Sequence, residues 1–204
     1  MTTGPPDWAT VYDTGTPPPW DIGRPQPVFA RLADSGLLTG ALLDSGCGTG
    51  ENSLLAAAHG ADVTGIDLAP GGIERARAKA AERGLSARFE VTDALNLASL
   101  GLTFDTIIDS GLFHVFDDEN RARYVASLAA VLRAGGRYYL LAFSDRQPGT
   151  EGPRRVTRDE ITAAFSDGWE VEDITAEAFE VHLGQAPGSG GPSAAAWLAT
   201  IRRL

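Results

Sequence analysis

The feature of this sequence that most constrains its fold is the regular alternation of short apolar segments with segments of helical pattern. Strands that alternate with helices build a parallel sheet with helices packed on both faces. The last two apolar segments have no helix between them, which favours an antiparallel hairpin at one edge. We therefore predict a doubly wound α/β sheet of seven strands, mostly parallel. The expected strands are 41–45, 61–67, 87–91, 104–109, 137–143, 169–181 and 194–201, and the expected helices are 28–35, 52–59, 72–83, 118–133 and 157–165.

The first 27 residues differ from the rest because they hold seven of the twelve prolines. This segment can form neither a regular helix nor a central strand, since proline lacks the backbone N–H that both need. It carries Trp8, Tyr12 and Trp20, and a disordered tail seldom holds such large aromatic side chains. We predict that residues 1–36 form an arm and a helix that fold back over part of a main domain, residues 37–204.

Composition excludes several classes of protein. The 204 residues are 43% hydrophobic and 22% charged, which is typical of one globular domain. A net charge of -10 disfavours nucleic acid and anionic membrane surfaces as partners. The chain has no apolar run of about 20 residues and no signal-peptide pattern at its start, so we expect a cytoplasmic protein. One cysteine, Cys47, and three histidines without ligand spacing predict neither a disulfide nor a bound metal.

A glycine-rich loop follows the first expected strand, where doubly wound sheets bind their ligands. Its sequence is Asp44-Ser-Gly-Cys-Gly-Thr-Gly50, and its glycines let backbone N–H groups approach a ligand closely. A dinucleotide-binding loop would have a third spaced glycine where Glu51 stands, so a carboxylate would face the pyrophosphate. No P-loop motif occurs either. The loop therefore favours a ligand that presents no phosphate there.

Carboxylates stand at the ends of the next three strands, at Asp67, Asp93 and Asp109. Asp67 is placed to accept the two hydroxyls of an adenosine ribose, and Asp93 to accept an exocyclic amine. Any one of these acids could instead cap a helix or a turn. Three of them beside one glycine loop are harder to explain as capping, so we interpret them as a nucleoside site.

These motifs together resemble those of the class I S-adenosylmethionine-dependent methyltransferases. The matching segments run in order over roughly half of the chain. The resemblance implies a Rossmann-like fold, S-adenosyl-L-methionine as the methyl donor and S-adenosyl-L-homocysteine as its product. The segments are Leu43–Gly50, Gly65–Asp67, Thr92–Ala94 and Leu132–Gly136.

Two further segments, Pro19–Arg24 and Phe104–Phe113, are similar to the thiopurine, thiol and halide methyltransferase group. They are also similar to small bacterial methyltransferases that act on quinones and heterocycles. The resemblance implies that Trp20 covers the cofactor and that the glycines pass the methionine moiety. It also implies that Asp67 holds the ribose, that Asp93 holds the adenine amine, and that Asp109 and Ser110 flank the sulfonium. The implied cofactor-binding residues are Trp20, Gly46, Cys47, Gly48, Asp67, Leu68, Thr92, Asp93, Ala94, Asp109 and Ser110.

Methyl transfer from a sulfonium is an in-line displacement that needs alignment and exclusion of water. A thiolate acceptor needs no base, whereas a hydroxyl acceptor does. His114 is the candidate general base, although a packed histidine before a helix is the alternative. Four aromatic residues could line an acceptor pocket or belong to the ordinary core: Tyr12, Phe113, Phe116 and Phe143. Arg154 is the candidate to hold a negative charge of the acceptor.

The predicted function is methyl transfer from S-adenosylmethionine to N, O or S of a small, flat heteroaromatic or quinol-type acceptor. A thiol or halide S-methyltransferase is the alternative among enzymes. A cofactor-binding sensor or partner subunit is the alternative outside enzymes. A nucleic-acid methyltransferase is disfavoured by the charge and by the lack of an Asn/Asp-Pro-Pro-Tyr/Phe motif. We expect a small-molecule partner, and a monomer or homodimer.

Overall fold

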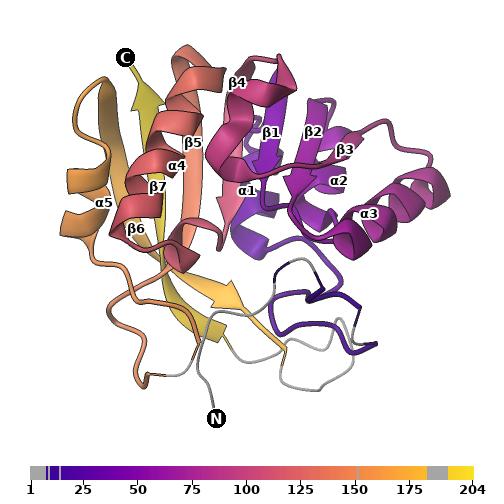
Figure 1. Cartoon of the computed structure of the whole chain (residues 1–204), viewed down its shortest axis with the longest axis horizontal. Helices are drawn as coiled ribbons and strands as arrows, with labels where there is room; N and C mark the ends of the chain where they lie inside the picture. Colours follow the sequence, from indigo (N-terminus) through magenta and orange to yellow (C-terminus); the bar gives the residue numbers. More distant parts are fainter. Residues whose placement is uncertain (1–7, 9, 14, 151, 183–192) are drawn as a thin grey trace.

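The computed structural model describes residues 8, 10–13, 15–150, 152–182 and 193–204 (Figure 1). The first residues of the predicted arm and the predicted connection at 184–192 lie outside the described residues. Within them the chain forms one twisted sheet with helices on both faces.

Seven strands form the sheet in the order β3-β2-β1-β4-β5-β7-β6. Neighbours from β3 to β5 pair in parallel, and β7 pairs antiparallel with both β5 and β6. This confirms the predicted doubly wound sheet with its antiparallel C-terminal hairpin. The strands are β1 (Ala41–Ser45), β2 (Asp62–Asp67), β3 (Arg88–Val91), β4 (Phe104–Ser110), β5 (Leu132–Phe143), β6 (Trp169–Glu180) and β7 (Ser193–Arg203).

The sheet separates two hydrophobic cores, one on each of its faces, and the helices cover them. One core joins α4, α5 and η1 to β4 and β5, and the other joins α1 and α2 to β1, β6 and β7. A smaller cluster packs α3 against α2 and β3. The helices are α1 (Pro27–Asp34), α2 (Glu51–Ala58), α3 (Pro70–Arg83), α4 (Asp118–Val131) and α5 (Arg158–Ala164), with the short 3-10 helices η1 (Ala94–Leu100) and η2 (Phe113–Val115).

Most predicted boundaries agree with the structure within a residue or two. Thr157 and Glu160 form the predicted capping box at the start of α5, with each side chain bonded to the other's backbone N–H. Helix α4 ends at Val131, before the predicted 133, because Leu132 already pairs with Phe104 of β4. The sequence did not predict η1 or η2, since 3-10 turns have no periodic apolar pattern.

The N-terminal arm lies beneath the carboxyl ends of the parallel strands (Figure 1). Tyr12 is buried against the glycine loop, and its hydroxyl accepts a hydrogen bond from the Trp20 indole N–H at 3.1 Å. At the other end of the arm, Gln26 exchanges two hydrogen bonds of 2.9 Å with the backbone of Glu180, at the end of β6. The arm therefore joins the two halves of the sheet.

None of the helices in the described part of the chain is long and apolar enough to cross a membrane.

Candidate functional site

The glycine loop after β1 is held against β2 by backbone hydrogen bonds. The N–H groups of Gly46 and Cys47 both donate to the Ile66 carbonyl, at 2.9 and 2.8 Å. Gly48 has φ +53°, and a Cβ there would lie 2.5 Å from the Tyr12 hydroxyl, so only glycine fits beneath the arm. Burial raises the pKa of the Cys47 thiol well above its usual range, with nearby carboxylates acting in the same direction. This thiol is therefore a poor nucleophile.

Asp67 fixes the relative position of the first two loops. Its carboxylate accepts one hydrogen bond from Gly48 N–H at 2.8 Å and one from Ala69 N–H at 2.9 Å. Burial raises the pKa of this carboxyl, and the backbone donors oppose that shift. Each carboxylate oxygen can accept a second hydrogen bond, so two acceptor positions remain at the end of β2.

The residues predicted to surround an adenine ring lie together beside Asp67. Asp67 pairs in register with Val91, and the N–H of Thr92 donates to the Asp67 carbonyl at 3.0 Å. Leu68 and Val91 are 49% and 48% exposed, although large apolar side chains are usually covered. Asp93 caps η1 through its Oδ1, which accepts from Leu95 N–H at 2.9 Å. The structure therefore brings together the predicted residues of the second and third loops.

Asp44 is a candidate site residue that the sequence did not single out. Its Oδ2 accepts a hydrogen bond from the Ser53 hydroxyl at 2.6 Å, while its buried Oδ1 has no partner among the described residues. Burial raises the pKa of Asp44 to about 7, and the nearby Asp109 and Asp67 add to the shift. An unpaired buried carboxylate oxygen is costly, so this atom fits a ligand that brings a cationic donor. The sequence signal was an acid next to the end of an otherwise apolar strand.

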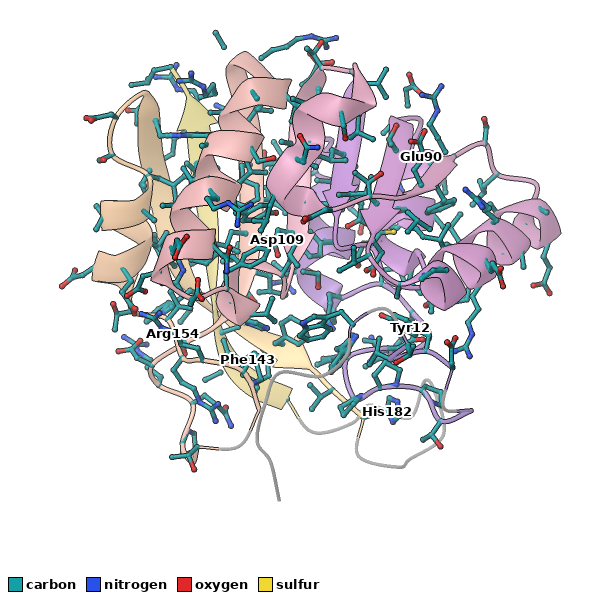
Figure 2. The ribbon with its side chains drawn as sticks, viewed as in Figure 1. Tyr12, Glu90, Asp109, Phe143, Arg154 and His182 are labelled. Carbon is teal, nitrogen blue, oxygen red and sulfur yellow. The ribbon has the colours of Figure 1, made fainter. Side chains whose placement is uncertain are left out.

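Asp109 is fully buried near the middle of the molecule (Figure 2). Its carboxylate accepts from the N–H groups of Leu112 at 2.7 Å and Phe113 at 3.1 Å, and from the hydroxyls of Tyr124 at 3.0 Å and Tyr138 at 2.8 Å. Burial raises the pKa of Asp109 to about 6, against the effect of these four donors. With so many internal donors, this carboxylate is better placed to hold the loop after β4 than to contact a sulfonium.

The Asp109 network extends to the glycine loop. The Tyr124 hydroxyl lies 2.9 Å from the hydroxyl of Ser45, the last residue of β1. Ser110, which the sequence analysis placed beside Asp109, is half-buried at the end of β4. The loops after β1 and β4 are therefore linked through one buried tyrosine.

His114 lies on η2 with its ring nearly covered. Its Nδ1 accepts a hydrogen bond from the backbone N–H of Phe143 at 3.0 Å, so the proton of the neutral ring is on Nε2. Burial lowers the pKa of His114 to about 3, and the positive charges of Arg121 and Arg155 add to the shift. A base would need a free lone pair on Nε2, so this geometry favours His114 as a hydrogen-bond donor.

Aromatic rings gather around His114 at the ends of β5 and β6. The half-buried Phe143 ring lies 5.1 Å from the His114 ring and 5.3 Å from the Phe179 ring, in edge-on contacts. Phe179 was not predicted as a site residue, because its segment shows only the weak alternation of an edge strand. In Figure 2, Phe143 and Tyr12 both lie at the lower edge of the molecule, where the parallel strands end.

The other predicted aromatic residues lie further from this cluster. Phe113 is fully buried and stacks on Phe165 at 5.8 Å, so it belongs to the core between η2 and α5. Phe116 is half-buried, with its ring 5.0 Å from that of Tyr124. Two aromatics three residues apart thus lie in different surroundings, which periodicity could not reveal.

Arg154 is exposed and ion-paired at the edge of the molecule (Figure 2). Its Nη1 lies 2.6 Å from Asp118 Oδ1, and its other terminal nitrogen pairs with Glu160. These partners already satisfy the guanidinium that the sequence analysis selected to hold an acceptor's charge. The neighbouring Arg155 places its guanidinium 5.9 Å from the Phe143 ring centre.

Comparisons with known proteins agree with this arrangement. A methyltransferase-domain family profile matches residues 42–136. The chain is 38% identical over 161 residues to the 2-heptyl-1-hydroxyquinolin-4(1H)-one methyltransferase of Mycobacteroides abscessus, a match that covers 78% of this chain and 71% of that protein. It is 29% identical over 138 residues to a probable thiol methyltransferase of Arabidopsis thaliana, a match that covers 67% of this chain and 61% of the plant protein.

Solved structures show the same fold. A structure from a study of the conversion of a disulfide bond into a thioacetal group during echinomycin biosynthesis superposes with a TM-score of 0.85 and 37% identity, over 96% of this chain and 91% of that one. The magnesium protoporphyrin IX methyltransferase of Synechocystis PCC 6803 with bound S-adenosylmethionine shares the fold at a TM-score of 0.63 and 22% identity, over 98% of this chain and 86% of that one. This chain belongs to the S-adenosylmethionine-dependent methyltransferases.

Proposed function

We propose that the protein transfers a methyl group from S-adenosylmethionine to N, O or S of a small, flat heteroaromatic or quinol-type acceptor. The observation that carries the proposal is the ring cluster of His114, Phe143 and Phe179 at the carboxyl ends of the strands. A flat ring can stack or make edge-on contacts with such a cluster. The 38% identity to a hydroxyquinolone methyltransferase supports the same acceptor class.

Two parts of the site have different roles in this proposal. The cofactor side consists of the loops after β1, β2 and β3. The acceptor side consists of the loops after β4 and β5 and the end of β6. S-adenosylmethionine supplies a methyl group on a positively charged sulfur, and the residues of the cofactor side fit it. Asp44 Oδ1 would accept from the amino group, Asp67 from the ribose hydroxyls and Asp93 from the adenine amine, between Leu68 and Val91.

The neutral state of His114 suits the acceptor side. Because its pKa is about 3, the ring carries no charge near pH 7 and does not repel a sulfonium. Its Nε2–H can donate a hydrogen bond to an acceptor atom and orient the ring that carries the nucleophile. The sulfonium loses its charge as the methyl leaves, so the protein needs to stabilise no growing anion. Alignment and exclusion of water are then its main contributions.

The arm has a role in that exclusion. We propose that residues 1–36 cover the cofactor side and that residues 37–204 form the methyltransferase domain. The buried Tyr12, packed on Gly48 and bonded to Trp20, supports this division. Trp20 is 36% exposed, which leaves part of its ring available to a ligand.

A thiol acceptor is the second candidate. The occupied Nδ1 of His114 and the internal donors on Asp109 leave neither group well placed as a base. A thiolate attacks without a base, and the similarity to a plant thiol methyltransferase points the same way. Hydroxylated acceptors would then react only if they ionise readily in solution.

A labelled-methyl assay tests the proposal across 1-hydroxyquinolin-4-one, hydroquinones, nitrogen heterocycles, aromatic thiols and halide ions. We expect turnover on the flat ring acceptors, fastest where the nucleophile is ionised at the assay pH. His114→Asn keeps a donor and should retain most activity, whereas His114→Phe should lose about 10-fold or more on oxygen acceptors. Activity confined to halide ions, protein or nucleic acid would contradict the proposed acceptor class.

A further inference from the structure

One buried guanidinium has a side that nothing in the described structure fills. Arg121 lies in the first turn of α4 with its side chain only 6% exposed, and its Cζ stands 4.5 Å from the centre of the Phe113 ring. Its Nη1 lies 3.5 Å from Glu160 Oε1 and 4.0 Å from Asp118 Oδ1. Its Nε and Nη2 are buried and have no hydrogen-bond partner in the described part of the chain.

The Nε and Nη2 atoms form the side of a guanidinium that binds a planar anion through two parallel hydrogen bonds. Arg137 uses this side on Glu172, at 2.8 and 3.1 Å. Arg77 uses the same side on the carbonyl of Phe89. Both of those arginines are more accessible to water than Arg121. An unsatisfied buried donor is costly, so the buried pair on Arg121 calls for a ligand.

The nearby carboxylates are already committed elsewhere. Glu160 Oε2 accepts from the Thr157 N–H at 2.8 Å in the capping box of α5, and its Oε1 pairs with Arg154. Asp118 Oδ1 also bonds Arg154, at 2.6 Å. Moving either carboxylate to the open side of Arg121 would break these bonds. Among the described residues, the two nearby carboxylates are therefore not free to partner this pair of donors.

Arg121 adjoins the proposed acceptor side of the site. Arg121 stacks on Phe113, the residue before His114, and its charge acts on the His114 ring. Arg155 reaches the same ring from the loop after β5. Both charges that act on His114 are thus positive, in a chain whose net charge is -10. Two positive charges beside the acceptor side can attract an anionic group of the acceptor.

We propose that Arg121 recognises a carboxylate, or an equivalent planar anion with two oxygens, carried by the acceptor. This inference rests on the proposed function, since it names the charge of the acceptor that the same site would take. It replaces Arg154, whose guanidinium is exposed and paired, with a buried guanidinium whose donor pair is open.

A matched pair of flat heteroaromatic thiols tests the proposal: 6-mercaptonicotinate, and 6-mercaptonicotinamide without the charge. Wild type should show a lower KM for the carboxylate. Arg121→Gln and Arg121→Lys should raise the carboxylate KM about 10- to 100-fold with little change in kcat, since lysine keeps the charge but not the paired donors. The KM for the amide should barely change. Arg154→Gln is the control, because it removes a guanidinium from the same two carboxylates.

Several outcomes would overturn the inference. Equal KM values for the two thiols in wild type would do so without any variant. So would an equal loss on both thiols in the Arg121 variants, which would assign Arg121 a purely structural role. If wild type methylates neither thiol, the proposed acceptor class fails for these probes. Calorimetry with nicotinate and nicotinamide in the presence of S-adenosylhomocysteine then tests separately whether Arg121 recognises a carboxylate. Preferential binding of nicotinate that is lost in Arg121→Lys supports recognition by the Nε and Nη2 donor pair of Arg121. Equal binding of nicotinate and nicotinamide refutes it.

Discussion

The proposed cofactor side and the proposed acceptor side of this site use their polar groups differently. On the cofactor side, Asp44 and Asp67 are held by one or two internal bonds each and keep acceptor positions open. On the acceptor side, Asp109 and His114 accept hydrogen bonds from buried groups of the protein itself, namely tyrosine hydroxyls and backbone N–H groups. Polar groups that stay open serve binding, whereas polar groups that are satisfied internally serve the shape of a pocket. Substitutions should therefore lower ligand affinity at Asp44 and Asp67, and stability at Asp109.

Asp109→Ala should have the largest effect on stability. The change leaves two backbone N–H groups and two tyrosine hydroxyls buried without their acceptor, which should cost about 3 kcal/mol or more of unfolding free energy. Asp109→Asn keeps one acceptor oxygen and should lose less. Chemical denaturation measures both, with the exposed Asp62→Ala as a control that should stay near wild type. A loss as small as that of the control would break the comparison.

His114 should give the acceptor side a distinctive dependence on pH. The unfolded chain binds a proton at His114 near pH 6.5, whereas the folded chain does so only near pH 3. Stability from this residue is therefore present above pH 6.5 and is lost as the pH falls toward 3. The loss by pH 5 should be about 2 kcal/mol relative to pH 7.

The measurement is the difference in unfolding free energy between wild type and His114→Asn at pH 7 and pH 5. Asp44 and Asp109 titrate in the opposite direction, because their raised pKa values favour the folded state as the pH falls. They are present in both proteins, so their effect cancels in the difference. A difference that stays constant from pH 7 to pH 5 would mean that His114 is not buried as a neutral ring.

Asp67→Ala tests the open polar groups of the cofactor side. The substitution removes the proposed acceptor for two ribose hydroxyls, so affinity for S-adenosylmethionine should fall at least tenfold. Asp62→Ala, at the other end of β2, is the matched control on the same strand. Calorimetric titration measures the affinity. An unchanged dissociation constant for Asp67→Ala would remove the ribose assignment from β2.

The sequence could place the loops of the proposed cofactor side together because their residues are close together along the chain. Each loop directly follows a strand, and parallel strands end at one edge, so the glycine loop, Asp67 and Asp93 had to meet there. The acceptor side depends on contacts between distant segments, such as Phe143 with Phe179. No local pattern encodes those contacts. The fold and half of the candidate site therefore follow from spacing, and the other half from tertiary packing.

Arg121 and Arg154 likewise show what could not be predicted from the sequence. Arg154 was selected because it lies in a loop after the fifth strand, where an acceptor site is expected. Arg121 lies within a helix, where a charged residue ordinarily faces solvent. Only the position of α4 against Phe113 and α5 reveals that Arg121 is buried and Arg154 exposed. Which charge is buried depends on helix orientation, which one sequence does not specify.

Trp20→Phe should give the smallest effect and would sharpen the comparison at the arm. It keeps an aromatic ring but removes the indole N–H that donates to the Tyr12 hydroxyl at 3.1 Å. A hydrogen bond of this kind contributes about 0.5–1.5 kcal/mol, so affinity for S-adenosylmethionine should fall about 2- to 10-fold if the arm closes over the cofactor.

Tyr12→Phe removes the other half of the same bond and should have a similar effect. The double variant should then lose little more than either single one, because both changes break one interaction. If the two losses add, the tyrosine and the indole act independently and the arm is not held over the glycine loop by this bond. Proteolysis adds a second observable, since cofactor should slow cleavage near Trp20 in wild type and slow it less in Trp20→Phe.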